Sequence, residues 1–419
     1  MIRFFNGRVL TLDGGLEVTE REVWTDGDKI AYVGTAKADM PAFEREIDLR
    51  GNLLMPGFKD AHTHSAMTFC RSLADDVPLQ PWLFEQIFPL EEKLTPERVY
   101  VFTKLAILEY VSGGITSAFD MYFFRLANAQ AAADCGFRYV VQGMNCPPAQ
   151  AEDEYVKCNS MSPLVSLIPG IHAEYTTSVE EMQIVADIVQ RHRAPFFTHI
   201  SETKSEHEEC VGRHGMTPTE LFESLGLFDY GGGGYHCVWL SEHDREIFKR
   251  RGLTVVSCPA SNAKLASGVA SLQEYIDLGL PLALGTDGPS SNNGLDMFRE
   301  MYLACVLQKL KCADAAAGNA EIILRAAVSG GAKAMGLTDC DCVAPGKQAD
   351  LIVIDLQRPS MQPIINIPKN LVYSGAKDCV VLTMVAGKVL YENGEFFLGE
   401  DPARIYETAQ REMEAMMAE

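Results

Sequence analysis

Five of the nine histidines lie at the ends of short apolar runs that have the composition of buried β-strands. They are His62, His64, His172, His199 and His236. Glu202 lies three residues after His199, and Asp287 lies near the end of another apolar run, 280–288. Imidazole and carboxylate groups bind divalent metals and also act as general acids and bases. Their repeated position at the ends of apolar runs therefore indicates a metal-dependent catalytic site.

The His62-x-His64 spacing favours two ligands to one metal ion. Residues i and i+2 of a strand point the same way, so both imidazoles can reach one ion from one strand end. His199 and Asp287 complete a set of three histidines and one carboxylate. This set suits Zn²⁺ and also Fe²⁺ or Mn²⁺. We therefore expect one divalent metal ion, with Zn²⁺ as the first choice.

A metal site with an open position also needs a proton carrier. Such a metal lowers the pKa of a bound water molecule to about 7, which gives hydroxide at neutral pH. Glu202 lies close enough to His199 in the sequence to serve the same cavity as an acid and base. His236, at the end of the next apolar run, is expected to hydrogen-bond the attacking oxygen. The sequence thus predicts a hydrolytic enzyme with Glu202 and His236 as catalytic residues.

Eight apolar, strand-like runs alternate with segments of helical spacing in the middle of the chain. The runs cover residues 53–62, 114–122, 138–144, 164–174, 195–202, 234–240, 253–259 and 280–288. Eight such units predict an α/β protein with a (β/α)₈ TIM barrel, in which catalytic groups lie at the carboxyl ends of the strands. A doubly wound sheet is the alternative, but no G-x-G-x-x-G follows the first run. Four consecutive glycines, 231–234, are expected to form a flexible connector.

Both ends of the chain have the composition of β-structure. Asn6-Gly7 and Asp26-Gly27 punctuate the first 55 residues, and Ala386-Gly387 and Asn393-Gly394 punctuate the segment 350–400. We therefore predict that residues 1–55 and 346–419 form one small β-sandwich domain, whose second part includes a C-terminal helix. Residues 56–345 are predicted to form the barrel.

The composition disfavours several classes of partner and protein. The chain has 36 Lys and Arg against 57 Asp and Glu, and the net charge of −21 disfavours nucleic acids and anionic membranes. No apolar run is long enough to span a bilayer, and the first residues lack a signal-peptide pattern. Twelve cysteines without such a signal indicate reduced thiols and a cytoplasmic protein. A small-molecule substrate is the expected partner, and the sequence leaves a homo-oligomer open.

Several segments resemble the amidohydrolase superfamily, and most of all its branch of 5′-methylthioadenosine/S-adenosylhomocysteine deaminases. They are PGFKDAHTHSAMTFCRSLADD (56–76), HISE (199–202), YHCVWL (235–240), PASNAKLASG (259–268) and LALGTDGPSSNNGLDMF (282–298). The resemblance runs over nearly the whole chain. It implies hydrolytic deamination of an adenine-type nucleoside, such as adenosine, 5′-deoxyadenosine, 5′-methylthioadenosine or S-adenosylhomocysteine, to the inosine analogue and ammonia.

The resemblance also implies roles for individual residues. Glu91 would contact the ribose hydroxyls, and His172 would contact the purine. Asp287 would be both a metal ligand and a helper in the proton transfers to the leaving group. The run 164–174 has no lysine that could bridge a second metal ion, which fits a site with a single metal.

Substrate choice stays open in the sequence. The same residues would serve hydrolysis of another aminated heterocycle of the guanine, pterin or triazine type, whereas a non-catalytic binding relative is disfavoured because every ligand and acid–base residue is present. Relatives that act on S-adenosylhomocysteine hold its carboxylate with arginines near residues 139–160. Here that stretch has Gln142, no arginine and one cation, Lys157, so we expect neutral 5′-substituents to be favoured.

Overall fold

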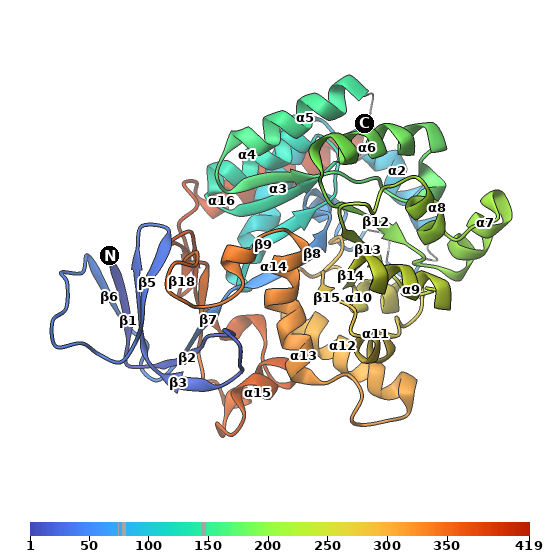
Figure 1. The fold of residues 1–419 in the computed structure, drawn as a ribbon. Helices are drawn as coiled ribbons and strands as arrows, with labels where there is room; N and C mark the ends of the chain where they lie inside the picture. Colours follow the sequence, from blue (N-terminus) through green and yellow to red (C-terminus); the bar gives the residue numbers. More distant parts are fainter. Residues whose placement is uncertain (74, 78–80, 144–147) are drawn as a thin grey trace.

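Eight parallel strands form the centre of the larger of two bodies. The structure, a computed structural model, describes residues 1–73, 75–77, 81–143 and 148–419 (Figure 1). The strands are β8 (Phe58–Thr63), β9 (Ile115–Asp120), β10 (Arg138–Gln142), β11 (Val165–Ile168), β12 (Phe196–Ile200), β13 (Gly232–His236), β14 (Thr254–Ser257) and β15 (Leu282–Leu284). They pair in chain order as two four-stranded sheets, which the bridges Thr63–Asp287 and Gly170–Phe197 join. The sheet therefore closes, and the prediction of a (β/α)₈ barrel is confirmed.

Aromatic side chains fill the inside of the barrel. The rings of Phe119 and Phe197 are 5.2 Å apart, and those of Phe197 and Tyr235 are 5.8 Å apart. All three side chains are at most 1% exposed. This packed interior supports the side chains at the carboxyl ends of the strands.

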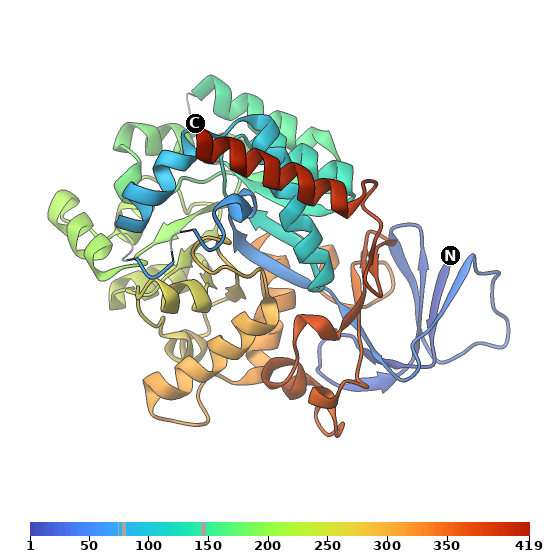
Figure 2. The same cartoon turned by 180° about the vertical axis from the view of Figure 1, so that it is seen from behind.

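Helices surround the barrel on the outside (Figures 1 and 2). They are α3 (Pro96–Ser112), α4 (Arg125–Cys135), α5 (Pro148–Met161), α6 (Val179–His192), α7 (Lys204–His214), α8 (Pro218–Ser224), α9 (Glu242–Arg251), α10 (Pro259–Lys264), α11 (Leu272–Leu278), α12 (Met297–Cys312), α13 (Ala320–Arg325) and α14 (Gly331–Ala334). Between β8 and α3, a π-helical turn, Trp82–Ile87, leads into α2 (Phe88–Glu91). Side-chain caps begin several helices, for example the capping box of Ser178 and Glu181 on α6.

Strands from both ends of the chain share one sheet in the smaller body. Its seven strands are β2 (Arg8–Leu10), β3 (Val18–Glu20), β7 (Leu53–Pro56), β16 (Leu351–Ile354), β17 (Val380–Val385), β18 (Lys388–Glu392) and β19 (Glu395–Phe396). A second sheet has four strands: β1 (Ile2–Phe5), β4 (Glu22–Asp26), β5 (Lys29–Gly34) and β6 (Arg45–Asp48). One hydrophobic core holds Phe4, Val23 and Leu351 from the two sheets together. The expected β-structure from both ends is therefore present.

Two helices in the part of the chain after β16 pack on the barrel. Helix α15 (Ile367–Tyr373) packs on α12 and α13, and the C-terminal helix α16 (Pro402–Ala418) packs on α3 (Figure 2). At the junction of the two bodies, Nε of Arg138 lies 2.7 Å from Oδ2 of Asp350, and Nζ of Lys59 lies 3.8 Å from the same oxygen. The three charged groups are buried, so each depends on the others for compensation.

The predicted strand 53–62 is divided in the structure. Residues 53–56 are β7 of the smaller body, and residues 58–63 are β8 of the barrel. At Gly57, between them, a Cβ atom would lie 2.1 Å from Cγ2 of Thr116. Only a glycine lets the chain pass so close to β9, so the two strands separate there.

The prediction that residues 231–234 form a flexible connector is wrong. Gly232, Gly233 and Gly234 are the first three residues of β13. A Cβ atom would lie 1.9 Å from the carbonyl oxygen of Phe196 at Gly232, and 2.2 Å from that of Thr254 at Gly233. The glycines therefore let β13 approach the neighbouring strands closely.

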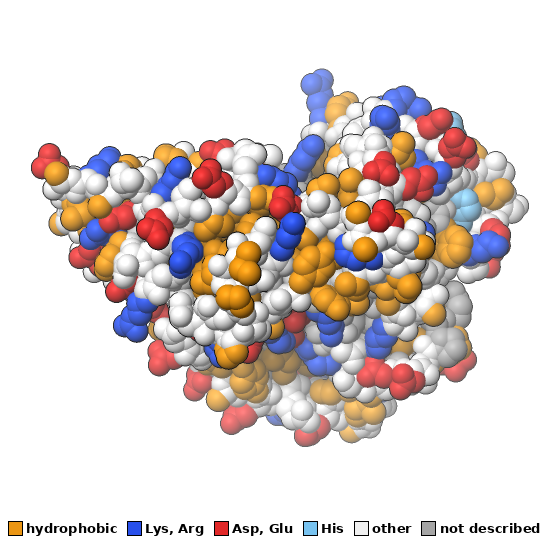
Figure 3. Space-filling view, turned by 90° about the horizontal axis from the view of Figure 1, so that it is seen from below, with side chains coloured by type: hydrophobic (Ala, Val, Ile, Leu, Met, Phe, Trp, Pro, Cys, Tyr) orange, Lys and Arg blue, Asp and Glu red, His pale blue; other side chains and the backbone are white. Residues whose placement is uncertain are grey.

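The surface carries charges of both signs. Figure 3 shows acidic and basic side chains interspersed, with hydrophobic side chains between them, on the face seen from below. Among the described residues, no helix combines the length and the apolar composition that crossing a bilayer requires. The eleven described cysteines are all free, and ten of them are buried.

Candidate active site

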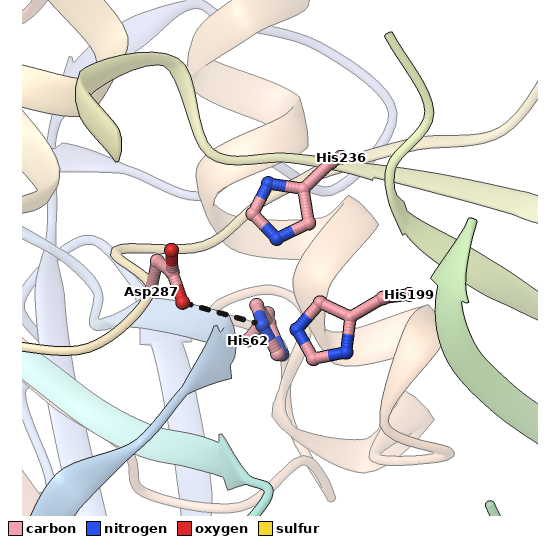
Figure 4. Close-up of side chains that lie close together, drawn as sticks. All are labelled: His62, His199, His236 and Asp287. Atoms are coloured by element: carbon pink, nitrogen blue, oxygen red, sulfur yellow. Dashed lines mark ion pairs between the residues drawn. The ribbon is translucent and has the colours of Figure 1, made fainter. Parts of the chain in front are cut away.

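The carboxyl ends of four barrel strands bring four buried side chains to one point. His62 lies in β8, His199 in β12 and His236 at the end of β13, and Asp287 follows β15. Their ligand atoms all lie within 4.8 Å of one another. Figure 4 shows the four side chains pointing toward a common centre, with the contact between Asp287 and His62 as a dashed line. This geometry suits a divalent metal ion.

His64, the other predicted ligand, lies beside this group. Its Nε2 atom is 3.1 Å from Oδ1 of Asp287, whereas Nε2 of His62 is 3.5 Å from that oxygen. The rings of His62 and His64 are 4.8 Å apart. The structure thus places four histidines near the carboxylate of Asp287, and His236 is the one that the sequence predicts outside the ligand set.

Hydrogen bonds to the far ring nitrogen orient two of the histidines. Nδ1 of His64 donates to the carbonyl oxygen of Met121 at 2.5 Å, and Nδ1 of His199 donates to that of His172 at 2.6 Å. Because each Nδ1 donates, each Nε2 can offer its lone pair to a metal ion. This arrangement is typical of imidazoles that bind metals.

The absence of hydrogen-bond partners at His62 among the described residues also indicates a metal site. The residue is fully buried, its ring stacks on Tyr235 at 3.8 Å, and neither ring nitrogen has a hydrogen-bond partner among the described residues. Burial lowers the pKa of His62 to about 3, so the ring is neutral. A buried imidazole without partners is costly, and a metal ion at Nε2 would remove that cost.

The two carboxylate oxygens of Asp287 have different neighbours. Oδ1 faces His62 and His64, and Oδ2 accepts hydrogen bonds from Ser261 and, at 2.8 Å, from Ser291. Burial would raise the pKa of Asp287, but the neighbouring side chains of His62 and His64 hold that pKa well below its ordinary value. The carboxylate is therefore charged and fixed in orientation, as a ligand must be.

His236 and Glu202 face each other across the site. Nε2 of His236 is 4.0 Å from Oε2 of Glu202, and Nδ1 of His236 is 2.7 Å from Oδ1 of Asn262. The other Glu202 oxygen, Oε1, accepts a hydrogen bond of 2.9 Å from Oγ of Ser267. One oxygen of Glu202 is thus anchored, and the other is directed toward the metal group.

Tight turns aim these side chains inward. Ser201, His236 and Asp287 have φ values of +48°, +64° and +58°, a region that residues other than glycine seldom adopt. Such strain concentrates at functional sites. The carboxylate of Glu206, on α7, accepts the backbone N–H of Ser201 at 2.9 Å and that of Glu202 at 2.8 Å, so it holds the turn after β12 in place.

A cavity of about 250 Å³ opens over this group. His64, His199, His236, Glu202 and Asp287 line its polar end, and the two predicted substrate residues, Glu91 and His172, also line it. Oε1 of Glu91 accepts the hydroxyl of Tyr122 at 2.7 Å. Nδ1 of His172 lies 2.8 Å from Oγ1 of Thr176, and its ring lies 4.8 Å from that of His199. Every predicted site residue except the buried His62 therefore borders the cavity.

Several residues of the site were not predicted, among them Tyr122, Asn262, Glu206 and Trp82. Tyr122 supports Glu91, Asn262 orients His236, and Glu206 holds the backbone of Glu202. The fourth, Trp82, lines the cavity with its Nε1 buried and without a hydrogen-bond partner among the described residues. Asn262 could have been suspected, since it lies in the segment 259–268 that follows a barrel strand; the others have no local signal.

The fold and the site agree with the relationship of the chain to known proteins. Residues 53–390 match the Amidohydrolase family, and the chain belongs to this family. The predicted family is confirmed.

Its relatives include named deaminases. The chain is 37% identical to a 5-methylthioadenosine/S-adenosylhomocysteine deaminase of Pelotomaculum thermopropionicum, over 96% of each chain. It is also 37% identical to a 5′-deoxyadenosine deaminase of Methanothrix thermoacetophila, over 95% of each. A crystal structure of an adenosine deaminase from Xanthomonas campestris with bound zinc superposes with a TM-score of 0.94 at 32% identity, over 100% of this chain and 99% of the other.

Proposed function

We propose that the protein is a metal-dependent hydrolase that deaminates adenine-type nucleosides at C6. The observation that carries the proposal is the close grouping of His62, His64, His199 and Asp287 at one cavity. Glu202, Glu91 and His172 line the same cavity. The relatives named for the deamination of such nucleosides support it. Water and the nucleoside give the inosine analogue and ammonia, since a C6–O bond forms and the C6–N bond breaks.

We propose His62, His64, His199 and Asp287 as the ligands of one divalent metal ion. Zn²⁺ is the proposed ion, supported by the donor set and by the zinc in the adenosine deaminase structure. When bound, the ion lowers the pKa of a water molecule and makes it nucleophilic at neutral pH. β11 carries no lysine to bridge a second ion, which supports one metal per chain.

Glu202 is the proposed proton carrier. Its free oxygen accepts a proton from the attacking water and delivers it to the ring nitrogen next to C6. Nε2 of His236, fixed by Asn262, holds the attacking oxygen in position, and Asp287 assists proton transfer to the departing amine. Ser267 keeps the Glu202 carboxylate in one orientation during both transfers.

Residues at the other end of the cavity bind the nucleoside. Oε1 of Glu91 is held by Tyr122, whereas Oε2 accepts no hydrogen bond from the described residues and is available to a ribose hydroxyl. Burial lowers the pKa of His172 to about 4, so its ring is neutral and suited to a hydrogen bond with the purine. The N–H of Trp82, which has no acceptor among the described residues, is a further donor for a polar group of the substrate.

Ammonia release by the purified protein tests the proposal. The substrates are adenosine, 5′-deoxyadenosine and 5′-methylthioadenosine, with guanine, a pterin and a triazine as alternatives. Turnover of an adenine nucleoside supports the proposal. Turnover of only another heterocycle would replace it, and no ammonia from any of them in the metal-loaded protein would reject it. A homo-oligomer stays a prediction, which sedimentation velocity would test.

A further inference from the structure

A buried glutamate on α12, which has no role in the proposed reaction, joins two loops at the carboxyl end of the barrel. The side chain of Glu300 is 0% exposed, and α12 packs on α10. Oε2 of Glu300 accepts the backbone N–H of Ala260 at 3.0 Å, and Oε1 accepts an N–H of the Asn292 side chain at 2.8 Å. Ala260 belongs to α10, which follows β14, and Asn292 belongs to the loop that follows β15. We call this link between Ala260 and Asn292 the Glu300 bridge.

The α10 end of the bridge leads to two residues of the metal group. Ala260 is the second residue of α10, so its N–H has no partner within the helix, and the carboxylate on α12 supplies one. Ser261, the next residue, donates a hydrogen bond to Oδ2 of Asp287. Oδ1 of Asn262 lies 2.7 Å from Nδ1 of His236. The bridge therefore fixes the start of the helix whose next two residues orient the aspartate and the histidine.

The other end of the bridge leads to the same aspartate. Nδ2 of Asn292 also donates to the carbonyl oxygen of Thr286 at 2.5 Å, and the backbone N–H of Asn292 donates to that of Gly288 at 2.9 Å. Ser291, its neighbour, donates to Oδ2 of Asp287 at 2.8 Å. The two hydroxyl groups that hold this oxygen thus come from the two loops that the bridge joins.

We infer that Glu300 is a positioning residue, which holds Asp287 and His236 in the orientation that the metal ion and the attacking oxygen require. The inference rests on the proposed function, which gives these two side chains their roles. Glu300 does not line the cavity, so it acts through the two loops. Glu91 and His172, which we propose to bind the nucleoside, lie in α2 and after β11, outside both loops. Loss of the bridge should therefore weaken metal binding and slow the reaction without weakening nucleoside binding.

Two variants at position 300 test the inference. Glu300→Met has a side chain of similar length and removes both acceptors, whereas Glu300→Gln keeps one. We expect Glu300→Met to lower the affinity for Zn²⁺, measured by competition with a chelator, at least about tenfold, as is typical for residues that support metal ligands. We expect kcat of its zinc-loaded form for adenosine to fall at least about tenfold while KM stays within about twofold. Glu300→Gln should lie between Glu300→Met and the parent protein in both measurements.

Thr383→Val is the matched control for the loss of a buried hydrogen bond. Thr383 is buried on β17 of the smaller body, and its hydroxyl donates to the carbonyl oxygen of Val111 at 2.6 Å. The change removes this bond and keeps the shape of the side chain. It should lower the melting temperature and leave zinc affinity and kcat unchanged.

The outcomes separate the inference from the proposed function. If the parent protein deaminates no adenine nucleoside, the proposed function fails, while the zinc affinities of the variants still test the bridge. If Glu300→Met binds zinc and turns over as the parent protein does, or if Thr383→Val shows equal losses, the inference is wrong and the proposed function stands. A rise in KM at unchanged kcat would also overturn it.

A second variant covers the case in which Glu300→Met does not fold. Asn292→Ala removes the other arm of the bridge and leaves the carboxylate with Ala260. We expect it to lower zinc affinity and kcat in the same way. Parent-like zinc affinity and kcat in Asn292→Ala would overturn the inference.

Discussion

Replacing Glu202 by glutamine separates proton transfer from every other task of the site. The side chain keeps its size, and its amide oxygen can still accept the hydrogen bond that Ser267 donates at 2.9 Å. The NH₂ group then takes the place of Oε2, the oxygen 4.0 Å from Nε2 of His236. An amide cannot take up a proton at neutral pH, so the change removes the carrier and leaves the metal group intact.

The loss can be estimated from general acid–base catalysis. Removal of a positioned proton carrier costs about 10²- to 10⁴-fold in rate, which corresponds to about 3–5 kcal/mol of activation free energy. Glu202 serves two transfers in the proposed reaction, so we expect kcat to fall toward the upper end. KM should change little, because the cavity walls are unchanged.

The assay is ammonia release under saturating nucleoside, with the metal content measured on the same sample. Glu208→Gln is the matched control, since Glu208 is an exposed glutamate six residues further on, paired with Lys204. It should retain full activity. A Glu202→Gln enzyme that keeps its metal and turns over within a few-fold of the parent protein would refute the assignment of the proton carrier. Loss of the metal would instead place Glu202 among the ligands.

Three further predictions concern the metal and the residues around it. Elemental analysis should find one divalent ion per chain, and a chelator should remove it together with activity and lower the melting temperature, because the four ligand side chains lose their common partner; two ions per active chain would contradict this. His236→Asn should retain the metal and slow the reaction, since we place His236 outside the ligand set although its ring lies within the metal group; metal loss would move it into that set. Glu206→Gln should lower kcat about tenfold or more at constant metal content, because one of the two backbone N–H groups at Ser201 and Glu202 loses its acceptor; unchanged kinetics would show that the turn needs no such support.

Much of the site could be predicted because it depends on short-range geometry. The His62-x-His64 spacing places two rings on one side of a strand whatever the rest of the chain does. Asp287 and His199 each follow an apolar run, and a closed parallel barrel brings all such ends to one face. The fold therefore converts separate sequence positions into neighbours.

Other features depend on contacts between distant segments, which no local pattern reveals. Glycines 232–234 resemble a loop in composition, and only the close approach of β12 and β14 explains them as strand residues. Trp82 and Tyr122 both line the cavity, and their place there depends on how the segment after β8 folds back over the barrel. Glu206 looks like any charged helix residue until the turn it holds is known.

The shared seven-stranded sheet sets an order on how the chain can fold during its synthesis. β7 and β16 are antiparallel neighbours, with Leu53 opposite Ile354, so one edge of β7 has no partner until the ribosome has added about 300 further residues. At ordinary rates of translation this delay lasts about 15–60 s. β15 ends at Leu284, so all eight barrel strands are available before β16 is made. A nascent or prematurely released chain therefore carries a complete set of barrel strands beside an open sheet edge, the kind of surface that aggregates or recruits chaperones.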